Sequence, residues 1–172
     1  MALAIISQPE LTDADSRRLE ALRARHDPLA RAIAGHFTLV FPFEGTAEAV
    51  AADHAAAVAQ QNARIEFRLT GAVAVRDSFA PRSHVFLLPD PGEAEIRRLH
   101  DDLYGGPLAP HLRADIPYRP HITVAAVADH GEAQAIAAGI GPLAIEGRLT
   151  ALQLVGFDGR MVTPLAALPL SG

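Results

Sequence analysis

Short segments of the chain recur in the same order at a spacing of about eighty residues, and this repeat restricts the possible folds more than any other feature. Residues 65–70 read Ile-Glu-x-Arg-Leu-Thr, and residues 145–150 read the same. Three other pairs keep the same order: Arg17-Arg18-Leu19 with Arg97-Arg98-Leu99, Pro28-Leu29-Ala30 with Pro107-Leu108-Ala109, and His36-x-Thr38-Leu39 with His121-x-Thr123-Val124. The repeat predicts two half-domains of strand–helix–strand–helix–strand type, packed about a pseudo-twofold axis.

Hydrophobic periodicity and turn residues place the elements of each half. The first half is expected to hold a strand at 2–7, a helix from the N-cap Thr12 to about His26, a strand carrying His36, a helix at about 46–61 and a strand at 64–76. The second half is expected to hold a strand at 83–89, a helix with Pro91 at its first position, a strand carrying His121, a helix at about 130–139 and a strand at 141–157. An Asp158-Gly159 hairpin turn then leads into a last strand at 160–168.

Each copy of the His-x-Thr motif lies in a segment that is typical of a strand, where successive side chains alternate between two faces. In the first copy one face carries His36 and Thr38, and the other face carries three apolar residues: Phe37, Leu39 and Phe41. In the second copy one face carries His121 and Thr123, and the other face carries two: Ile122 and Val124. Each strand therefore buries an apolar face and presents a histidine and a hydroxyl on the opposite face. The repeat brings both histidines into one shared cleft.

Length and composition limit the class of protein. We expect 172 residues, 49% of them hydrophobic, to form one bilobal domain, 1–172, whose repeat units span roughly 1–77 and 82–160. A formal net charge of −5 argues against binding to a long nucleic acid tract, which needs a basic face. The absence of cysteine excludes disulfides and thiolate metal sites. Without a long apolar segment, we expect a monomeric, cytoplasmic protein that does not associate with membranes.

The paired His-x-Thr motifs, the segment Tyr118-Arg119-Pro120-His121-Ile122-Thr123 and the repeat resemble the 2H phosphoesterase superfamily. Within it, nearly the whole chain is similar to the 2′-5′ RNA ligase-like, RNA 2′,3′-cyclic phosphodiesterase branch. The resemblance implies an α+β fold of two pseudo-symmetric lobes, each an antiparallel sheet with helices on its outer face, facing across a central cleft. Two positions depart from the family pattern: Gly35 stands where proline is common, and Ala125-Ala126 stands where many relatives carry a basic residue.

The resemblance implies metal-independent cleavage or joining at the phosphoesters of a nucleotide or a short RNA end, most often the opening of a 2′,3′-cyclic phosphate. We expect a hydrolase that needs no cofactor. Opening such a ring needs a base and an acid on opposite sides of phosphorus, and imidazole serves as either near neutral pH. We therefore expect His36 and His121 to be the acid–base pair. Thr38 and Thr123 are expected to donate hydrogen bonds to the non-bridging phosphate oxygens.

Residues in or beside the loops that flank the cleft are candidates for substrate binding. The two cationic candidates are Arg82 and Arg119, and Arg119 is expected to meet phosphate. The three aromatic candidates are Phe43, Phe79 and Tyr118. Phe79 and Tyr118 could stack on a base, and the alternative for each is a place in the core, which is more common for an aromatic residue near a strand end. Structural roles are expected for the other six histidines: His26, His54, His84, His100, His111 and His130.

Two other functions are compatible with the same motif residues. A non-catalytic module that binds a nucleotide or an RNA end would keep the cleft without turnover, but the retention of both histidines and both threonines favours the enzyme. A zinc site built from His36 and His121 would need a third ligand. Neither motif supplies one, because threonine is a poor zinc ligand, and so we expect no metal.

Overall fold

The structure is a computed structural model that describes residues 1–159 and 161–172. Over these residues, nine strands form one antiparallel sheet in the order β2-β7-β4-β5-β6-β3-β1-β8-β9. The strands are β1 (Ala2–Ser7), β2 (Glu10–Leu11), β3 (Phe37–Phe43), β4 (Ile65–Arg76), β5 (Ser83–Pro89), β6 (Ile122–Val127), β7 (Ile145–Leu149), β8 (Ala151–Phe157) and β9 (Val162–Pro169). The helices are α1 (Asp13–His26), α2 (Glu48–Gln61), α3 (Glu93–Leu103) and α4 (His130–Ile140), with a short 3₁₀ helix at Gly106–His111.

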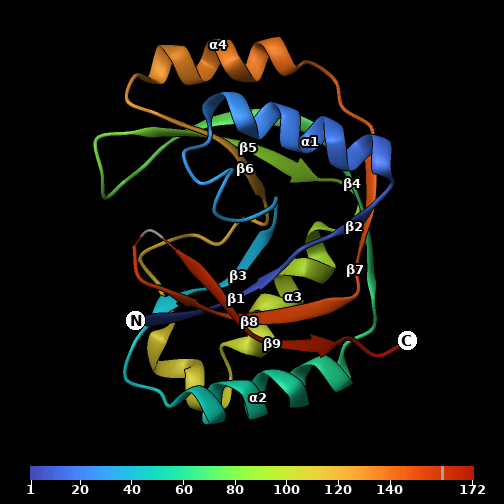
Figure 1. Cartoon of the computed structure of the whole chain (residues 1–172), viewed down its shortest axis with the longest axis vertical. Coiled ribbons are helices and arrows are strands. Elements are labelled where there is room, and N and C mark those ends of the chain that lie inside the picture. The colour runs from blue at the N-terminus through green and yellow to red at the C-terminus, as the bar shows by residue number, and fades with distance from the viewer. Residues whose placement is uncertain (160) are drawn as a thin grey trace.

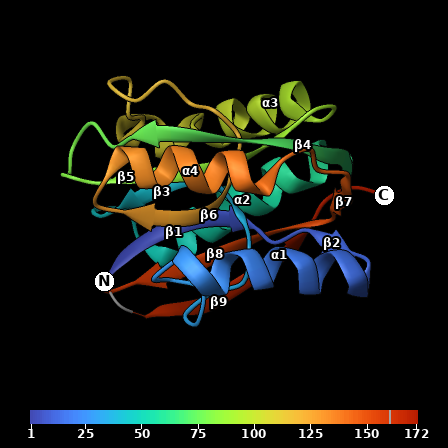
Figure 2. The same ribbon diagram turned by 90° about the horizontal axis from the view of Figure 1, so that it is seen from above.

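The sheet curls because the chain joins its two ends. β7 pairs with β4 near one end of the sheet, and β8 pairs with β1 near the other, yet only Thr150 separates β7 from β8. The two ends must therefore come together, and Figures 1 and 2 show the resulting curved sheet from two directions. The predicted single strand at 141–157 is thus wrong, since the chain changes its pairing partner at Thr150.

The helices divide into two pairs, one for each half of the sheet. Helix α4 packs on β4, β5 and β6, and α1 packs on β6; α2 packs on β8 and β9, and α3 packs on β3. Figure 1 shows α1 and α4 together at the top of the view and α2 and α3 toward the bottom. This arrangement confirms the predicted α+β fold with antiparallel strands and outer helices. In the described part of the chain, no helix is long and apolar enough to cross a membrane.

The two copies of the Ile-Glu-x-Arg-Leu-Thr segment pair with each other. Residues 65–69 run antiparallel to residues 145–149, with Phe67 opposite Gly147 at the centre. Two symmetry-related ion pairs cross this strand pair: Arg68–Glu146 at 2.8 Å and Arg148–Glu66 at 3.1 Å. After each copy the chain pairs with a different strand: the rest of β4 pairs with β5, whereas β8, which follows β7, pairs with β1. This pairing supports the proposed internal repeat.

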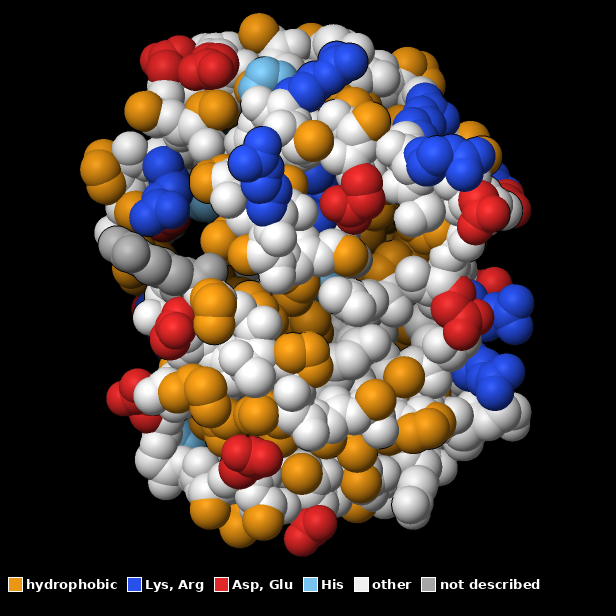
Figure 3. All heavy atoms as spheres, in the orientation of Figure 1, with side chains coloured by type: hydrophobic (Ala, Val, Ile, Leu, Met, Phe, Trp, Pro, Cys, Tyr) orange, Lys and Arg blue, Asp and Glu red, His pale blue; other side chains and the backbone are white. Residues whose placement is uncertain are grey.

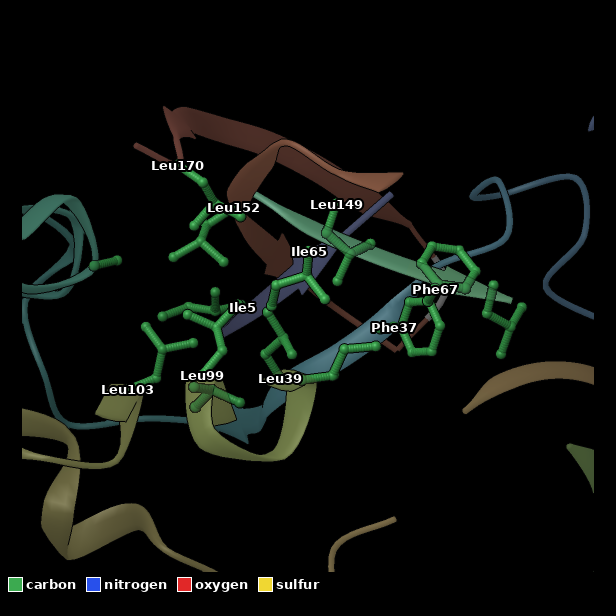
Figure 4. Close-up of a cluster of buried hydrophobic side chains, with 14 of the residues drawn as sticks. Ile5, Phe37, Leu39, Ile65, Phe67, Leu99, Leu103, Leu149, Leu152 and Leu170 are labelled. Carbon is green, nitrogen blue, oxygen red and sulfur yellow. The ribbon is translucent and has the colours of Figure 1, made fainter. Parts of the chain in front are cut away.

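A contact in the core joins the centre of the β4–β7 pair to β3, the strand that carries Thr38 of the first His-x-Thr motif. Phe67 and Phe37 are buried and meet edge to face, with ring centroids 5.1 Å apart and an interplanar angle of 80°. Figure 4 shows the two rings beside a layer of aliphatic side chains that includes Ile65, Leu39 and Leu149. Burial of aliphatic and aromatic side chains at this density supplies most of the driving force for folding.

The predicted position of Pro91 at the start of a helix is also wrong. The Asp90–Pro91 peptide bond is cis, and α3 begins at Glu93 with Gly92 as its N-cap. Residues 90 and 91 instead bond to β4, because Asp90 N–H donates to Arg68 O and Pro91 O accepts from Arg68 N–H. Gly92 has φ +108° and lies against Phe67, where a Cβ would come within 2.5 Å. Position 92 therefore favours glycine.

Replacing Gly147 with alanine should destabilise the fold, because the added Cβ would lie 2.6 Å from both Phe67 Cζ and Leu11 Cδ2. Overpacking of a core in this way costs on the order of 1–3 kcal/mol. Urea unfolding at neutral pH measures this loss.

Gly139→Ala is the matched control. Gly139 lies near the end of α4, and an added Cβ would meet nothing within 4 Å. This substitution should be neutral or stabilise the protein by up to about 1 kcal/mol. Equal stabilities of the two variants would contradict the packing role of Gly147.

Candidate active site

The two His-x-Thr motifs meet at the centre of the sheet, where β3 and β6 are neighbours. The register of this antiparallel pair places Phe37 opposite Ile122. Extending it by one residue each way pairs each histidine with the threonine of the other motif: His36 with Thr123, and His121 with Thr38. Side chains opposite each other on antiparallel strands have Cβ atoms about 4.5–5.5 Å apart. The four motif side chains therefore form one compact group.

Along β3 and β6, buried side chains alternate with less buried ones as the sequence predicts, with one exception. The predicted inward residues Phe37, Leu39, Ile122 and Val124 are all buried. Phe41 was predicted to join them, but it is only half-buried and lines a cavity, while Val40 is buried instead. The reason is a bulge: Ile6 of β1 pairs with Thr38 and Ile5 pairs with Val40, so two residue steps on β3 lie opposite one step on β1.

A backbone carbonyl fixes the tautomer of each motif histidine. His36 Nδ1 lies 2.9 Å from Ala34 O, and His121 Nδ1 lies 2.6 Å from Arg119 O. Because a carbonyl oxygen only accepts hydrogen bonds, Nδ1 must carry the proton in both rings. Nε2 is then the nitrogen that exchanges a proton in each histidine. The same i−2 contact in both motifs gives the two rings equivalent orientations.

A buried charge network supports the segment that leads to His36. Arg23 is buried; its guanidinium bonds to Glu20, to Asp27 and to the carbonyl of Ile33. Glu20 also accepts from the Gly35 N–H at 2.7 Å. Proline at position 35 would lose this donor, and a side chain there would lie 2.7 Å from Leu19 Cδ2. These two contacts favour glycine over proline at position 35.

Burial is the main cause that lowers the pKa of His36 below its ordinary value of 6.5. The hydrogen bond to Ala34 O opposes this by favouring the protonated ring. Arg23 lowers the pKa further, while the carboxylates of Asp27 and Glu20 raise it. The His36 side chain is half-buried.

His121 lies in a different environment. Its ring stacks on Phe86, with centroids 3.6 Å apart and an interplanar angle of 19°. Burial lowers the pKa of His121 to about 4, against the opposing hydrogen bond to Arg119 O. The nearby groups of His84, His36 and Arg119 lower it further. The two motif histidines therefore have similar geometry but unequal surroundings.

Two cavities meet at the motif residues and share Thr123 and His84 in their linings. The first has a volume of about 520 Å³ and is lined by His121, arginines and aromatic rings. The second has a volume of about 580 Å³ and is lined by His36, Thr38 and further arginines. Each cavity thus reaches one histidine, and Thr123 lies where the two cavities meet.

Three of the five residues predicted to bind substrate line these cavities. Arg119 and Phe79 line the first cavity, and Arg82 lines the second. Phe79 is 61% exposed, so its ring is open to a ligand. The guanidinium of Arg113 lies 5.0 Å from the centre of this ring.

Tyr118 and Phe43 have other positions. The Tyr118 hydroxyl donates to Thr38 O at 3.1 Å, and the ring stacks on His100 with centroids 3.5 Å apart. Phe43 is buried and stacks on His111. Neither ring belongs to the described lining of the two cavities, so both support the motif strand β3 rather than the cleft.

Sequence reasoning missed a pair at the end of the β4–β5 hairpin. His84 Nε2 lies 3.2 Å from Asp77 Oδ2, and Asp77 Oδ1 accepts from the N–H groups of Phe79 and Ala80. His84 was expected to be structural, yet it lines both cavities. The available signal was the strand predicted at 83–89, because alternation along a strand puts His84 and Phe86 on the same face, which is half-buried in the structure.

Four of the other histidines have the structural bonds that were expected. Their partners are backbone or hydroxyl oxygens: His54 with Leu103 O, His100 with Leu39 O, His111 with Thr46 Oγ1 and His130 with Ser83 Oγ. Within residues 1–159 and 161–172, no group of three or more His, Asp or Glu side chains is arranged to hold a metal ion.

A curled antiparallel sheet with a His-x-Thr motif on each of two central strands has the architecture of a 2H phosphoesterase. The chain belongs to the 2′-5′ RNA ligase superfamily, whose family model matches residues 11–160. A search of curated proteins gave no match.

Solved structures share the fold over the whole chain. TT0787 of Thermus thermophilus is 20% identical with a TM-score of 0.70, and the match covers 100% of this chain and 99% of the TT0787 chain. Escherichia coli LigT, solved with 3′-AMP, is 22% identical with a TM-score of 0.60, and the match covers 99% of this chain and 98% of the LigT chain. Usb1 of Kluyveromyces marxianus is 10% identical with a TM-score of 0.60, covering 98% of each chain. LigT has also been solved with NADP+ and with ATP.

The two aromatic residues Tyr118 and Phe79 should respond to substitution in opposite ways. Tyr118→Phe removes the hydroxyl that donates to Thr38 O and should lower the free energy of unfolding by about 0.5–1.5 kcal/mol, with nucleotide affinity unchanged. Phe79→Ala should leave stability unchanged and weaken binding, since stacking of a base contributes about 1–3 kcal/mol. Urea unfolding and calorimetric titration with an adenosine monophosphate measure both quantities. Weaker binding by Tyr118→Phe at unchanged stability would contradict these roles.

Acid should weaken the fold through His121. Its pKa is about 4 in the folded protein and 6.5 in the unfolded chain, so between these values only the unfolded chain binds the proton. The free energy of unfolding should therefore fall as the pH drops from 6.5 to 4. His121→Gln removes this contribution, and urea unfolding at the two pH values should show a smaller loss in the variant. Equal losses would show that His121 titrates normally.

Proposed function

We propose that the protein is a metal-independent phosphoesterase that acts on phosphodiesters of nucleotides or RNA ends and opens 2′,3′-cyclic phosphates. The proposal rests on the pairing of β3 with β6, which places each histidine opposite the threonine of the other motif. This arrangement supplies two proton-transfer groups and two hydroxyl donors around one point. The family of the chain supports phosphoester chemistry in general.

In this mechanism one histidine removes a proton from water through its unprotonated Nε2, and the resulting hydroxide attacks phosphorus. The other histidine, protonated on Nε2, gives its proton to the 2′ or 3′ oxygen as the P–O bond breaks. Attack and departure are in line, so the two rings must stand on opposite sides of phosphorus. Each proton transfer of this kind contributes about 10²–10⁴ to the rate.

The threonines would stabilise charge on the phosphate. Thr38 and Thr123 are half-buried; Thr38 lines the second cavity, and Thr123 lies where the two cavities meet. Their hydroxyls can donate to the non-bridging oxygens, whose negative charge grows in the transition state. Because these donors are held by strands, little reorganisation is needed during the reaction.

The charge distribution favours a small anionic ligand. Arg76 and Arg119 line the first cavity together with Asp77, and Arg82 lines the second, where Asp27 is paired with the buried Arg23, within a chain of net charge −5. On the face seen in Figure 3, basic side chains gather over the half that carries α1 and are mixed with acidic ones. The LigT complexes with 3′-AMP, ATP and NADP+ support a nucleotide as the ligand class.

Loss of either motif histidine should abolish turnover. Nucleoside 2′,3′-cyclic phosphates and short RNAs with a cyclic phosphate end should be opened in the presence of EDTA. His36→Ala and His121→Ala should each lower kcat by about 10²–10⁴. Chromatography of the products gives the rate and identifies the oxygen that leaves.

His54→Gln is the control histidine, because His54 lies on α2 and bonds to Leu103 O away from the cleft. It should keep the wild-type rate. Full activity of either motif variant would overturn the assignment. Binding of these ligands without turnover by the wild-type protein would instead establish a non-catalytic binding module.

A further inference from the structure

The neighbours of the two motifs differ at equivalent positions. On the outer side of β3, Ile6 of β1 pairs with Thr38. On the outer side of β6, Phe86 of β5 pairs with Thr123. The register is the same in both halves, but one position holds an aliphatic side chain and the other holds an aromatic ring. The two motifs therefore differ most clearly at this pair of positions.

Phe86 contacts the motif histidine directly. Its ring lies 3.6 Å from that of His121 by centroid distance, nearly parallel, and also stacks on His84 at 5.6 Å and 17°. His84 in turn is held by Asp77 at 3.2 Å. The three rings form a row along the first cavity, fixed at one end by a carboxylate and at the other by the bond from His121 to Arg119 O.

This row restricts His121 in two ways. A ring at stacking distance prevents rotation of the imidazole about its χ2 bond. It also covers one face of the imidazole and excludes water, which disfavours the cation. The electron-rich face of Phe86 favours a cation instead, but burial is the largest cause acting on His121 and lowers its pKa. The groups facing His121 are His84 from β5, His36 from β3 and Arg119 from its own segment, and all three disfavour a further positive charge.

His36 has neighbours of the opposite kind. Ile6 is buried with Ala4 and Val155 in a small cluster. The charged groups that act on His36 are Arg23, which disfavours its protonated form, and two carboxylates, Asp27 and Glu20, which favour it. His36 thus has carboxylates near it, whereas the titratable and charged groups that act on His121 are two histidines and an arginine.

We propose that Phe86 is a positioning residue that makes the two motifs unequal: by covering one face of His121 it selects this histidine as the general base and leaves His36 as the acid. The inference rests on the proposed two-histidine reaction. In that reaction His121 Nε2 takes a proton from water, the hydroxide forms a bond to phosphorus, and the leaving oxygen takes the proton of His36. Afterwards the two histidines recover their starting protonation through solvent.

The test follows each imidazole by NMR, through its Cε1–H signal, during a pH titration. Signals are assigned by their loss in His36→Gln and His121→Gln. Phe86→Leu should raise the pKa of His121 by about one unit or more and leave that of His36 in place. Phe86→Tyr keeps the ring and should keep the wild-type titration. Ile6→Leu, at the equivalent position of the other motif, should leave the pKa of His121 unchanged.

Activity provides the second readout. In Phe86→Leu the acidic limb of the kcat/KM profile should move to higher pH with His121, and kcat/KM at neutral pH should fall about tenfold to a hundredfold. A Phe86→Leu protein in which the pKa of His121 stays or falls, or in which both histidines shift together, would overturn the proposal. A shifted His121 in a protein that turns over no substrate would overturn the proposed function and the base assignment, while upholding the contact of Phe86 with His121.

Discussion

The pairing of β3 with β6 is the contact on which the rest of the site depends. It joins the two halves of the sheet at Phe37 and Ile122, and it places all four motif side chains on one face. At the opposite point of the curled sheet, β4 and β7 pair around Phe67 and Gly147. Because the ring of Phe37 packs against Phe67, the core connects these two junctions directly. The geometry of the cleft is therefore fixed from behind by packing.

The site shows how a nearly symmetric frame can hold unequal chemistry. Backbone contacts repeat closely, since each motif histidine bonds to the carbonyl two residues before it. Side chains outside the motifs break the symmetry: Glu20, Arg23 and Asp27 surround one histidine, while Phe86 and Arg119 surround the other. A reaction that needs both an acid and a base gains from this inequality, because the two histidines must differ in protonation at the same pH.

Much of this organisation could be predicted from the sequence, because the repeat, the alternation of apolar residues and the Thr12 helix cap are local signals. The motif residues followed from their duplication. Long-range geometry could not be predicted. The strand break at Thr150 depends on closure of the sheet. The partial exposure of Phe41 depends on a bulge against β1, and the position of His84 in the cleft depends on the pairing of β5 with β6. Tyr118 was misplaced for the same reason, since its partner Thr38 is eighty residues away.

The carbonyl of Arg119 has a consequence for how such a site can diversify. The group that orients His121 belongs to the main chain, while the side chain of the same residue lines the first cavity. Substitution at position 119 therefore alters what the cavity recognises and leaves the imidazole tautomer in place. Ala34 serves His36 through its own carbonyl in the same manner. In the proposed reaction, proton transfer depends on main-chain carbonyls and the imidazoles while ligand choice depends on the neighbouring side chains, so new substrates can be acquired without rebuilding the chemistry.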